Sequence, residues 1–480
     1  MIKNWVFVTI KRSNVGRNFI VNGREQFKSR LGFLLLSAGC AIGIGNVWRF
    51  PYVVGQNGGG IFVLFYLLFL VIMGVPILSM EFAVGRASKK SPVRAYQALE
   101  KPGQKWHLHG YVALLGNYGL MMFYTTVAGW MLYYFYGFLT GKFSGVSSEQ
   151  VGSVFNDMLA SPSTNIMWMV IVVVLGIVVC SFGLQNGVER ITKIMMIGLL
   201  TLMVVLAFRG LTLDGGLDGL RFYLLPDLEK VRAIGEGNLL LGLFSVIVAA
   251  MNQSFFTLSL GIGAMAIFGS YLGKDKRLLG EAVNVAVLDT FVAIVAGLII
   301  FPACFAFGVS PDSGPSLIFI TLPNVFLEMP GGRIWGTLFF LFMSFAAFST
   351  VIAVFENIIA CCMEMWNIDR RKVAAINLVL IILLSLPCAL GYNVLSGIQP
   401  LGEGSAILDL EDFIVSNVLL PLGSLVYLVF CTWKWGWGFK NYQAEANQGN
   451  GLSVPGWLRG YVTYVLPVLV FALFLQGILR

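Results

Sequence analysis

SAGCAIGIGNVWRFP, residues 37–51, lies inside an apolar run from Leu31 to Val54 that is long enough to cross a bilayer, since one crossing takes about 20 residues. Glycine lowers helix stability by about 1 kcal/mol per site, and proline removes a backbone donor. We predict a helix that breaks near mid-membrane, where broken backbone is tolerated only if it is buried in protein or lines a cavity. The alternative is a helix-packing face made by two of the glycines. The residues behind this prediction are Gly39, Gly43, Gly45, Asn46, Arg49 and Pro51.

The composition places the chain in a membrane. Of its 480 residues, 57% are hydrophobic and 12% are charged, which is about half the charged share of a soluble protein. Apolar runs recur along the whole length, as in a polytopic membrane protein. The net charge of +8 does not point to nucleic acid, because the basic residues gather between the apolar runs. The two histidines, His107 and His109, are assigned no chemistry.

Eleven apolar spans follow one another, and each is expected to be a helix. The longest are expected to tilt or to project into water. The predicted spans are 31–53, 60–84, 108–139, 165–182, 189–209, 237–271, 282–308, 334–366, 373–391, 407–433 and 456–478.

The basic residues orient the chain by the positive-inside rule. With a cytoplasmic N-terminus, 24 of the 32 Lys and Arg residues fall in cytoplasmic segments, seven fall in outer segments, and Arg49 lies in span 1. We therefore expect a multi-pass protein of the plasma (inner) membrane, with its C-terminus on the extracellular or periplasmic side. Residues 309–333 carry four prolines around the apolar piece SLIFITL, which predicts an extracellular lid loop with a short helix.

A second glycine-interrupted span lies at 237–271. Its stretch QSFFTLSLGIGAM (253–265) carries Gly261 and Gly263 just after Thr257 and Ser259. Paired interrupted spans at matching places in two halves are the best sequence pointer to a transport site, because half-helix N-termini attract anions and half-helix C-termini attract cations. The predicted organisation is a cytoplasmic segment 1–30, a first five-helix repeat 31–210, an extracellular loop 211–236, a second repeat 237–434, and a cytoplasmic loop with span 11 at 435–480.

Five motifs resemble the neurotransmitter:sodium symporter family, in family order and with family spacing. They are GIGNVWRFPY (43–52), QNGGGIF (56–62), GVPILSMEFAVGR (74–86), FYTTVAGW (123–130) and SFFTLSLGIG (254–263). The short termini and eleven spans look like the prokaryotic amino-acid transporter branch. The resemblance implies an all-α polytopic membrane protein with a 5+5 inverted repeat (a LeuT-like fold), unwound first and sixth spans, and an accessory eleventh helix.

The resemblance also implies two sodium sites built from oxygen ligands, which suit a hard cation. Taken alone, Ser349 and Thr350 would be interpreted as hydroxyls that bond back to the preceding helical turn. The residues implied for the first site are Ala41, through its carbonyl, with Asn46, Thr257, Asp289 and the substrate carboxylate. Those implied for the second are the carbonyls of Gly39, Ile42 and Ala346 with the hydroxyls of Ser349 and Thr350.

A substrate pocket is implied at the two breaks. Family members that carry amines without a carboxylate have an acidic residue where this chain has Gly43, so we predict a zwitterionic amino acid whose own carboxylate meets the first sodium ion. Apolar lining residues favour an apolar or aromatic side chain, although one methylene is worth only about 1–3 kcal/mol of discrimination. The implied pocket residues are Ala41, Gly43, Gly45, Leu120, Tyr124, Phe256, Thr257, Ser259, Ile262, Thr350 and Val354.

Three carboxylates lie within spans, where an ionisable residue costs at least about 2.5 kcal/mol. Glu81 is implied to hold the loose backbone of span 6, and Glu356 receives no firm role. Asp289 stands where many members have Asn, and its fixed charge predicts transport without chloride. Tyr66 and Gln253 match the chloride neighbourhood of other members, so chloride dependence stays open, as does a proton carried by Asp289.

Two gates are implied by the same resemblance. The outer gate would pair Arg49 with Asp412. The inner gate would pair Arg24 with Glu364, supported by Phe27 and Tyr271. An exposed ion pair is worth about 0–1 kcal/mol, which suits a contact that must open in every cycle.

The predicted function is sodium-coupled import of an amino acid by alternating access. The sequence shows no metal-ligand cluster and no nucleophile–base arrangement, so an enzyme is not predicted. The expected partners are an amino-acid substrate, sodium ions and the lipid bilayer, and a homodimer stays open. The alternatives are a proton-coupled transporter of the same architecture, an ion channel, and an amino-acid sensor that does not transport.

Overall fold

The computed structural model describes residues 25–309 and 317–479, and within these ranges the chain forms helices and no β-strand. In the part of the chain that the structure describes, nine continuous helices and one helix pair bent by 56° are long and apolar enough to cross a membrane. Helix α6 (His107–Thr140) adds the eleventh span, since its 34 residues extend over about 51 Å. The predicted order of eleven spans is therefore confirmed.

The eleven spans differ from the predicted ranges by only a few residues at each end. In order they are α1, η1 and α2 (Arg30–Ala41, Gly45–Arg49, Phe50–Gln56); α3, η2 and α4 (Gly60–Phe69, Leu70–Gly74, Val75–Ser88); α6; α8 (Pro162–Ser181); η3 and α9 (Leu184–Glu189, Arg190–Leu211); α12 and α13 (Leu239–Thr257, Ala264–Ser270); α14 (Leu278–Ala306); α16 (Gly332–Trp366); α17 (Arg370–Leu390); α18, η5 and α19 (Ile407–Phe413, Ile414–Leu419, Leu420–Thr432); and α21, η6 and α22 (Leu458–Gly460, Tyr461–Val465, Leu466–Leu479).

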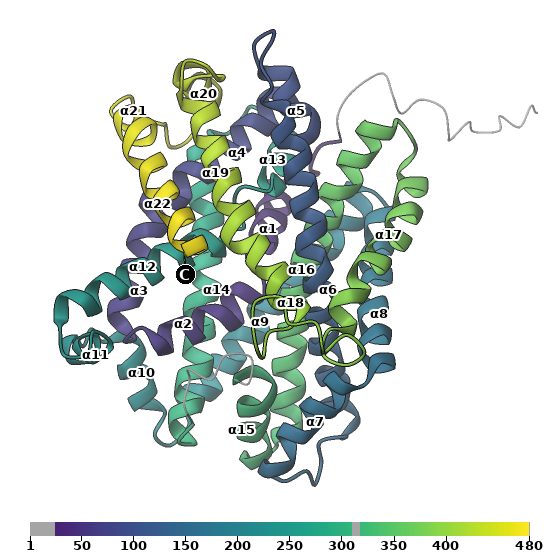
Figure 1. Cartoon of the computed structure of the whole chain (residues 1–480), viewed down its shortest axis with the longest axis vertical. Helices are drawn as coiled ribbons and strands as arrows, with labels where there is room; N and C mark the ends of the chain where they lie inside the picture. The colour runs from purple at the N-terminus through teal and green to yellow at the C-terminus, as the bar shows by residue number, and fades with distance from the viewer. Residues whose placement is uncertain (1–24, 310–316, 480) are drawn as a thin grey trace, which may run out of the picture.

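Short connecting helices lie at two opposite ends of the molecule (Figure 1). Helices α5 (Pro92–Leu99) and α20 (Phe439–Ala446) mark one end, which we call the α5 end. Helices α7 (Ser148–Ala160), α10 (Gly216–Leu224) and α15 (Leu322–Glu328) mark the other, the α15 end. Connections that alternate between the two ends are expected when successive spans cross the membrane in opposite directions.

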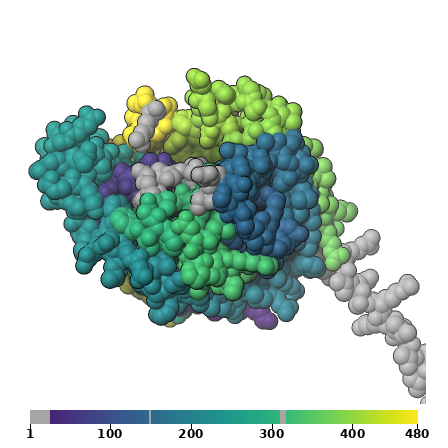
Figure 2. Space-filling model, turned by 90° about the horizontal axis from the view of Figure 1, so that it is seen from below, coloured from purple at the N-terminus to yellow at the C-terminus, as the bar shows by residue number. Residues whose placement is uncertain are grey.

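The long connections are more ordered than the sequence suggested. Residues 211–236 were expected as a loop, but they form α10 and α11 (Leu228–Ile234), because Gly215 adopts a left-handed φ of 82° and Asp227 caps the start of α11. The short helix expected in 309–333 is present as η4 (Leu317–Thr321) and α15. Seen from the α15 end, the teal segment that carries α11 projects sideways, and purple atoms of the first span come into view between the yellow and teal segments (Figure 2).

Burial separates the central helices from the peripheral ones. In an apolar stretch of 18 residues within α16, 83% is buried inside the protein. The corresponding share is 28% in the span that ends with α22. Helix α1 packs against α9, α14 and α16, so the first span lies inside the bundle. Unwound backbone at this depth is covered by protein, as a bilayer requires.

Both predicted breaks are present. Helix α1 ends at Ala41, and the chain becomes helical again at Gly45 after a bend. Pro51 does not cause this break, because it lies in the first turn of α2, where a missing N–H is tolerated. The second break separates α12 from α13, and Gly261 has a φ of +101° there. A Cβ on Gly261 would collide with the Leu420 carbonyl, so only glycine fits.

Candidate functional site

Three side chains predicted for the first sodium site meet between the breaks. The Asn46 amide nitrogen donates to Asp289 Oδ1 at 2.8 Å, and the Thr257 hydroxyl donates to Asp289 Oδ2 at 3.0 Å. All three residues are buried. Asn46 Oδ1 is buried without a hydrogen-bond partner in the described ranges. A carboxylate, a hydroxyl and a free amide oxygen in one buried place form a donor set that fits a hard cation.

The residues predicted for the second site also come together. The Ser349 hydroxyl lies 3.2 Å from the Ile42 carbonyl oxygen, and the Thr350 hydroxyl lies 3.3 Å from that of Gly39. Ser349 also donates to the Ala346 carbonyl at 2.8 Å. The α1 carbonyls are left free by the break, because a helix ends with carbonyls that have no intrahelical partner. Helix α16 thus presents two hydroxyls to the open end of α1.

The predicted pocket lies against the same break. The Ile44 N–H donates to the Tyr124 hydroxyl at 3.0 Å. A Cβ on Gly43 would lie 2.5 Å from that hydroxyl and 2.7 Å from Thr350 Oγ1, and a Cβ on Gly45 would lie 2.8 Å from the Phe256 ring. The two glycines therefore allow side chains of α6, α12 and α16 to approach the backbone of the first span closely.

The remaining predicted pocket residues lie at the two breaks or on α6 and α16. Ser259 has a left-handed φ of +50° in the second break. Ile262, three residues after Ser259, packs against Gly116 of α6. Gly116 lies one helical turn before Leu120. The apolar members of the predicted set are all buried: Ala41, Leu120, Ile262 and Val354.

Glu81 and two asparagines hold the second break in place. The Gly261 N–H donates to Glu81 Oε1 at 2.5 Å. Asn117 donates to the Ile262 carbonyl at 2.7 Å, and Asn357 donates to Asn117 Oδ1 at 3.0 Å. Neither asparagine is among the predicted site residues. The signal was available, because a polar amide within an apolar span usually bonds across helices.

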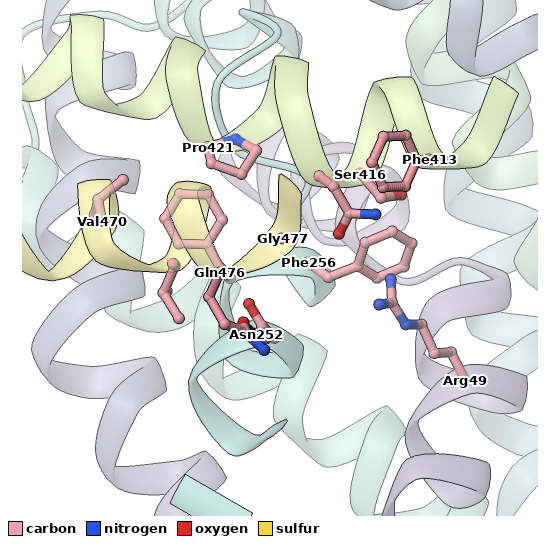
Figure 3. A pocket seen from close by; sticks show the side chains of 12 residues that line it. Arg49, Asn252, Phe256, Phe413, Ser416, Pro421, Val470, Gln476 and Gly477 are labelled. Carbon is pink, nitrogen blue, oxygen red and sulfur yellow. Dashed lines mark hydrogen bonds between the residues drawn. The ribbon is translucent and has the colours of Figure 1, made fainter. Parts of the chain in front are cut away.

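The predicted outer gate is not paired in this conformation. The Arg49 guanidinium lies 4.0 Å from the centre of the Phe256 ring, and no ion pair joins it to Asp412 within the described ranges, where Asp412 accepts a hydrogen bond from Ser416 at 2.6 Å. A cavity of about 310 Å³ lies between α12, η5 and α22, and Arg49 lines it from the first span. Figure 3 shows Arg49 beside Phe256 on one side of it, with Phe413 and Ser416 on the other.

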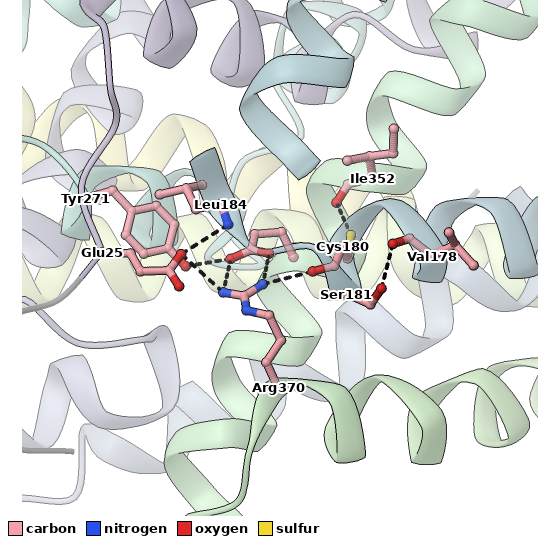
Figure 4. Close-up of polar contacts among 9 residues, drawn as sticks. Glu25, Val178, Cys180, Ser181, Leu184, Tyr271, Ile352 and Arg370 are labelled. Carbon is pink, nitrogen blue, oxygen red and sulfur yellow. Dashed lines mark hydrogen bonds and ion pairs between the residues drawn. The ribbon is translucent and has the colours of Figure 1, made fainter. Parts of the chain in front are cut away.

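The α5 end is tied together by a network that the sequence did not predict. Tyr271 donates to Glu356 at 2.8 Å, and Arg370 pairs with Glu356 at 2.6 Å. Glu25 lies 3.5 Å from Arg370 and accepts the Leu184 N–H at 3.1 Å. Figure 4 shows these contacts around the Arg370 guanidinium. Glu356, which has no predicted role, thus links α16 to Arg370 at the start of α17 and to Tyr271, which follows α13.

The other predicted inner-gate residues lie nearby. The Phe27 ring packs edge-on against Tyr271 with centroids 5.7 Å apart. Glu364 accepts the Ser91 N–H and hydroxyl at 3.0 and 2.7 Å. Arg24, the predicted partner of Glu364, lies outside the described residues.

Glu356→Gln is expected to destabilise the protein strongly. Removing one partner of a buried pair costs about 3–5 kcal/mol, because the other charge stays buried, and Glu356 is fully buried while Arg370 is 13% exposed. The melting temperature of the purified protein measures the effect. The control is Glu229→Gln, which breaks the exposed pair with Arg232 on α11 and should cost at most about 1 kcal/mol. Equal losses in the two variants would contradict the assignment.

Comparisons with known proteins agree with this geometry. A model of the sodium:neurotransmitter symporter family matches residues 24–150 and 148–480. An uncharacterized sodium-dependent transporter of Bacillus subtilis is 35% identical over 85% of this chain and 88% of that protein. A sodium-dependent serotonin transporter of Drosophila melanogaster is 27% identical over 95% of this chain and 76% of that protein. The solved structure of MhsT in complex with L-phenylalanine is 37% identical, has a TM-score of 0.83, and covers 95% of this chain and 100% of that one.

Two spans broken at matching places, with oxygen donors gathered at the breaks, define a polytopic sodium-coupled transporter and not an enzyme. The chain belongs to the sodium:neurotransmitter symporter family. Its LeuT-like fold and its sodium dependence follow from this membership. The predictions of family, fold and sodium-coupled transport are thereby confirmed.

Proposed function

We propose that this chain imports a zwitterionic amino acid with an apolar or aromatic side chain. The observation that carries the proposal is Gly43, because the absence of a side chain there lets the Tyr124 and Thr350 hydroxyls lie against the break in the first span, where a Cβ would collide with both. The first span carries no acid at this position, so the carboxylate of the cargo can contact the first sodium ion in addition to Asp289. The buried apolar residues Leu120, Ile262 and Val354 favour an apolar side chain. The relative solved with L-phenylalanine supports the same class.

Two sodium ions accompany the amino acid in this proposal. The first binds at Asn46, Thr257 and Asp289, together with the Ala41 carbonyl and the cargo carboxylate. The second binds between the α1 carbonyls and the hydroxyls of Ser349 and Thr350. The support is the convergence of these oxygens at the break in the first span.

The proposed orientation places the α5 end in the cytoplasm and the α15 end outside. It rests on the distribution of the Lys and Arg residues and keeps the repeats at 31–210 and 237–434. Sodium orders the two breaks, and the amino acid completes the first site. Arg49 then leaves Phe256 for Asp412, while the contacts of Glu356 with Tyr271 and Arg370 release the inner side. Coupling requires that cargo and sodium bind the two states with different affinities, and a membrane potential adds about 2.3 kcal/mol per charge per 100 mV.

The direct test is uptake of a panel of labelled amino acids into proteoliposomes, with sodium, potassium and chloride varied independently. We expect sodium-dependent uptake of apolar or aromatic amino acids without a need for chloride. Acid-stimulated uptake without sodium would establish the proton-coupled alternative. Saturable binding without uptake would establish the sensor.

Asp289→Asn is expected to make uptake depend on chloride. Asp289 is fully buried, and its two oxygens accept hydrogen bonds from Asn46 and Thr257, so in this proposal its loss removes the fixed negative charge beside the ion. We expect uptake by the variant to fall at least about tenfold without chloride, since breaking a buried charge pair costs about 3–5 kcal/mol, and to recover when chloride is added. The control is Asp218→Asn on α10, where the carboxylate is exposed. A chloride requirement in the unmodified protein would refute the idea.

A further inference from the structure

A group of polar side chains lies behind the break in span 6, apart from both sodium sites. It combines one carboxylate, one imidazole and three hydroxyls, and each presents a buried atom without a hydrogen-bond partner in the described ranges. Leaving such an atom unsatisfied costs about 1–3 kcal/mol. We call this group the polar chamber. Its unpartnered atoms are Glu81 Oε2, Tyr96 Oη, His109 Nε2, Ser424 Oγ and Tyr427 Oη.

Ring contacts and close approaches place the five side chains together. The Tyr96 ring lies 5.3 Å from that of His109 and 5.4 Å from that of Tyr427, and the His109 and Tyr427 rings are 5.5 Å apart. A Cβ on Gly261 would lie 3.0 Å from Ser424 Oγ, and one on Gly263 would lie 3.1 Å from Tyr427 Oη. The group therefore lies against the unwound backbone of span 6 at Gly261 and Gly263.

Glu81 and His109 both lie near the same glycine. The Gly261 N–H donates to Glu81, and the His109 side chain lies close to the Gly261 backbone. An imidazolium can donate to a carbonyl with one nitrogen and to water with the other. It also balances the charge of the neighbouring carboxylate, which a buried site requires.

We propose that the polar chamber is a proton-binding site, in which ordered water and one proton are shared between His109 and Glu81. Buried waters typically make about three hydrogen bonds to polar groups that are otherwise unsatisfied, and the chamber supplies five such groups. The proton is bound while Gly261 is clamped. When span 6 moves, the imidazole loses its partner and the proton leaves through the chamber water.

Few charged side chains on the neighbouring elements are free to bind this proton in place of His109 and Glu81. Arg86 of α4 pairs with Glu445, and Glu364 of α16 bonds to Ser91. His107, on the same helix as His109, pairs with Glu100. The other titratable groups next to the chamber are the thiols of Cys40, Cys361 and Cys431.

Sodium and the chamber proton should therefore bind cooperatively. The sodium ligands converge in the same conformation in which Gly261 is clamped, so sodium favours the proton-bound form. By linkage, a proton at the chamber raises the affinity for sodium by the same factor. This inference rests on the sodium dependence of the family and does not depend on which amino acid the protein transports.

The chain has only two histidines, which makes a spectroscopic test direct. Imidazole NMR signals of the full-length protein, labelled with ¹⁵N-histidine, are recorded between about pH 5 and 8, where histidine changes charge. His107→Gln and His109→Gln assign the two signals, and sodium is compared with potassium at constant ionic strength. We expect sodium to move the His109 signal toward the imidazolium position at fixed pH, and to leave the His107 signal unchanged.

Two further measurements complete the test. Glu81→Gln should weaken proton binding at His109, and if that variant does not accumulate, Tyr427→Phe removes a hydroxyl of the chamber instead. Sodium added to unbuffered protein with a pH-sensitive dye should cause proton uptake by the unmodified protein and His107→Gln, but not by His109→Gln. A His109 signal that stays neutral with and without sodium across the whole pH range would overturn the proposal. So would equal proton uptake by His109→Gln and the unmodified protein.

Discussion

Gly43→Ala is expected to lower amino-acid binding at least about tenfold while leaving the protein folded. The added methyl group would lie 2.5 Å from the Tyr124 hydroxyl and 2.7 Å from that of Thr350. Overpacking of this kind costs about 1–3 kcal/mol, and Tyr124 would also lose its hydrogen bond from the Ile44 N–H. Since the cargo carboxylate is proposed to bind beside Tyr124, displacing that side chain should weaken binding of the amino acid.

The control for this variant is Gly152→Ala in α7, where a Cβ would meet nothing within 4 Å. That change should leave binding unaltered and stabilise α7 slightly, since alanine is the better helix former. Binding of the best amino acid from the uptake panel is measured by equilibrium dialysis at saturating sodium. Unchanged affinity in Gly43→Ala would show that the cargo does not occupy the space beside Tyr124.

The sequence predicted the features that are encoded locally. Each span is an apolar run bounded by polar residues, so its place can be read without knowing its neighbours. The break in the first span follows from glycines at 39, 43 and 45, and the break at Gly261 follows from a backbone conformation that other residues rarely adopt. The family motifs then supplied the residues that meet at these breaks.

Contacts between distant segments could not be predicted in the same way. Glu25 meets Leu184 and Arg370 only because three helix ends converge at the α5 end, and no local pattern encodes that meeting. The position of Arg49 over Phe256 depends on the conformation of the protein. The folding of 211–236 into α10 and α11 was missed because both helices are short and rest on one cap and one left-handed glycine.

Ser349→Ala is expected to raise the sodium concentration needed for binding by about tenfold or more. The Ser349 hydroxyl touches the Ala346 carbonyl of its own helix and the Ile42 carbonyl at the end of α1. If the Ser349 hydroxyl bonded only to the Ala346 carbonyl, removing it would have the same effect as removing any hydroxyl that bonds back to its own helix. If it also contacts a cation, the loss is that of an interaction with a charged group, about 1.5–3 kcal/mol, and 1.4 kcal/mol corresponds to a factor of ten.

Ser344 provides a matched control on the same helix. It is buried like Ser349 and donates to the Phe340 carbonyl at 2.7 Å, one turn earlier in α16. Ser344→Ala therefore removes a back-bonded hydroxyl and no proposed sodium ligand. The measurement is the sodium concentration that gives half of the thermal stabilisation, at constant ionic strength with potassium, because a ligand of the folded state raises stability by mass action. Equal shifts in the two variants would reduce Ser349 to a helical hydroxyl, whereas a shift in Ser349→Ala alone would place a cation between α16 and the open end of α1.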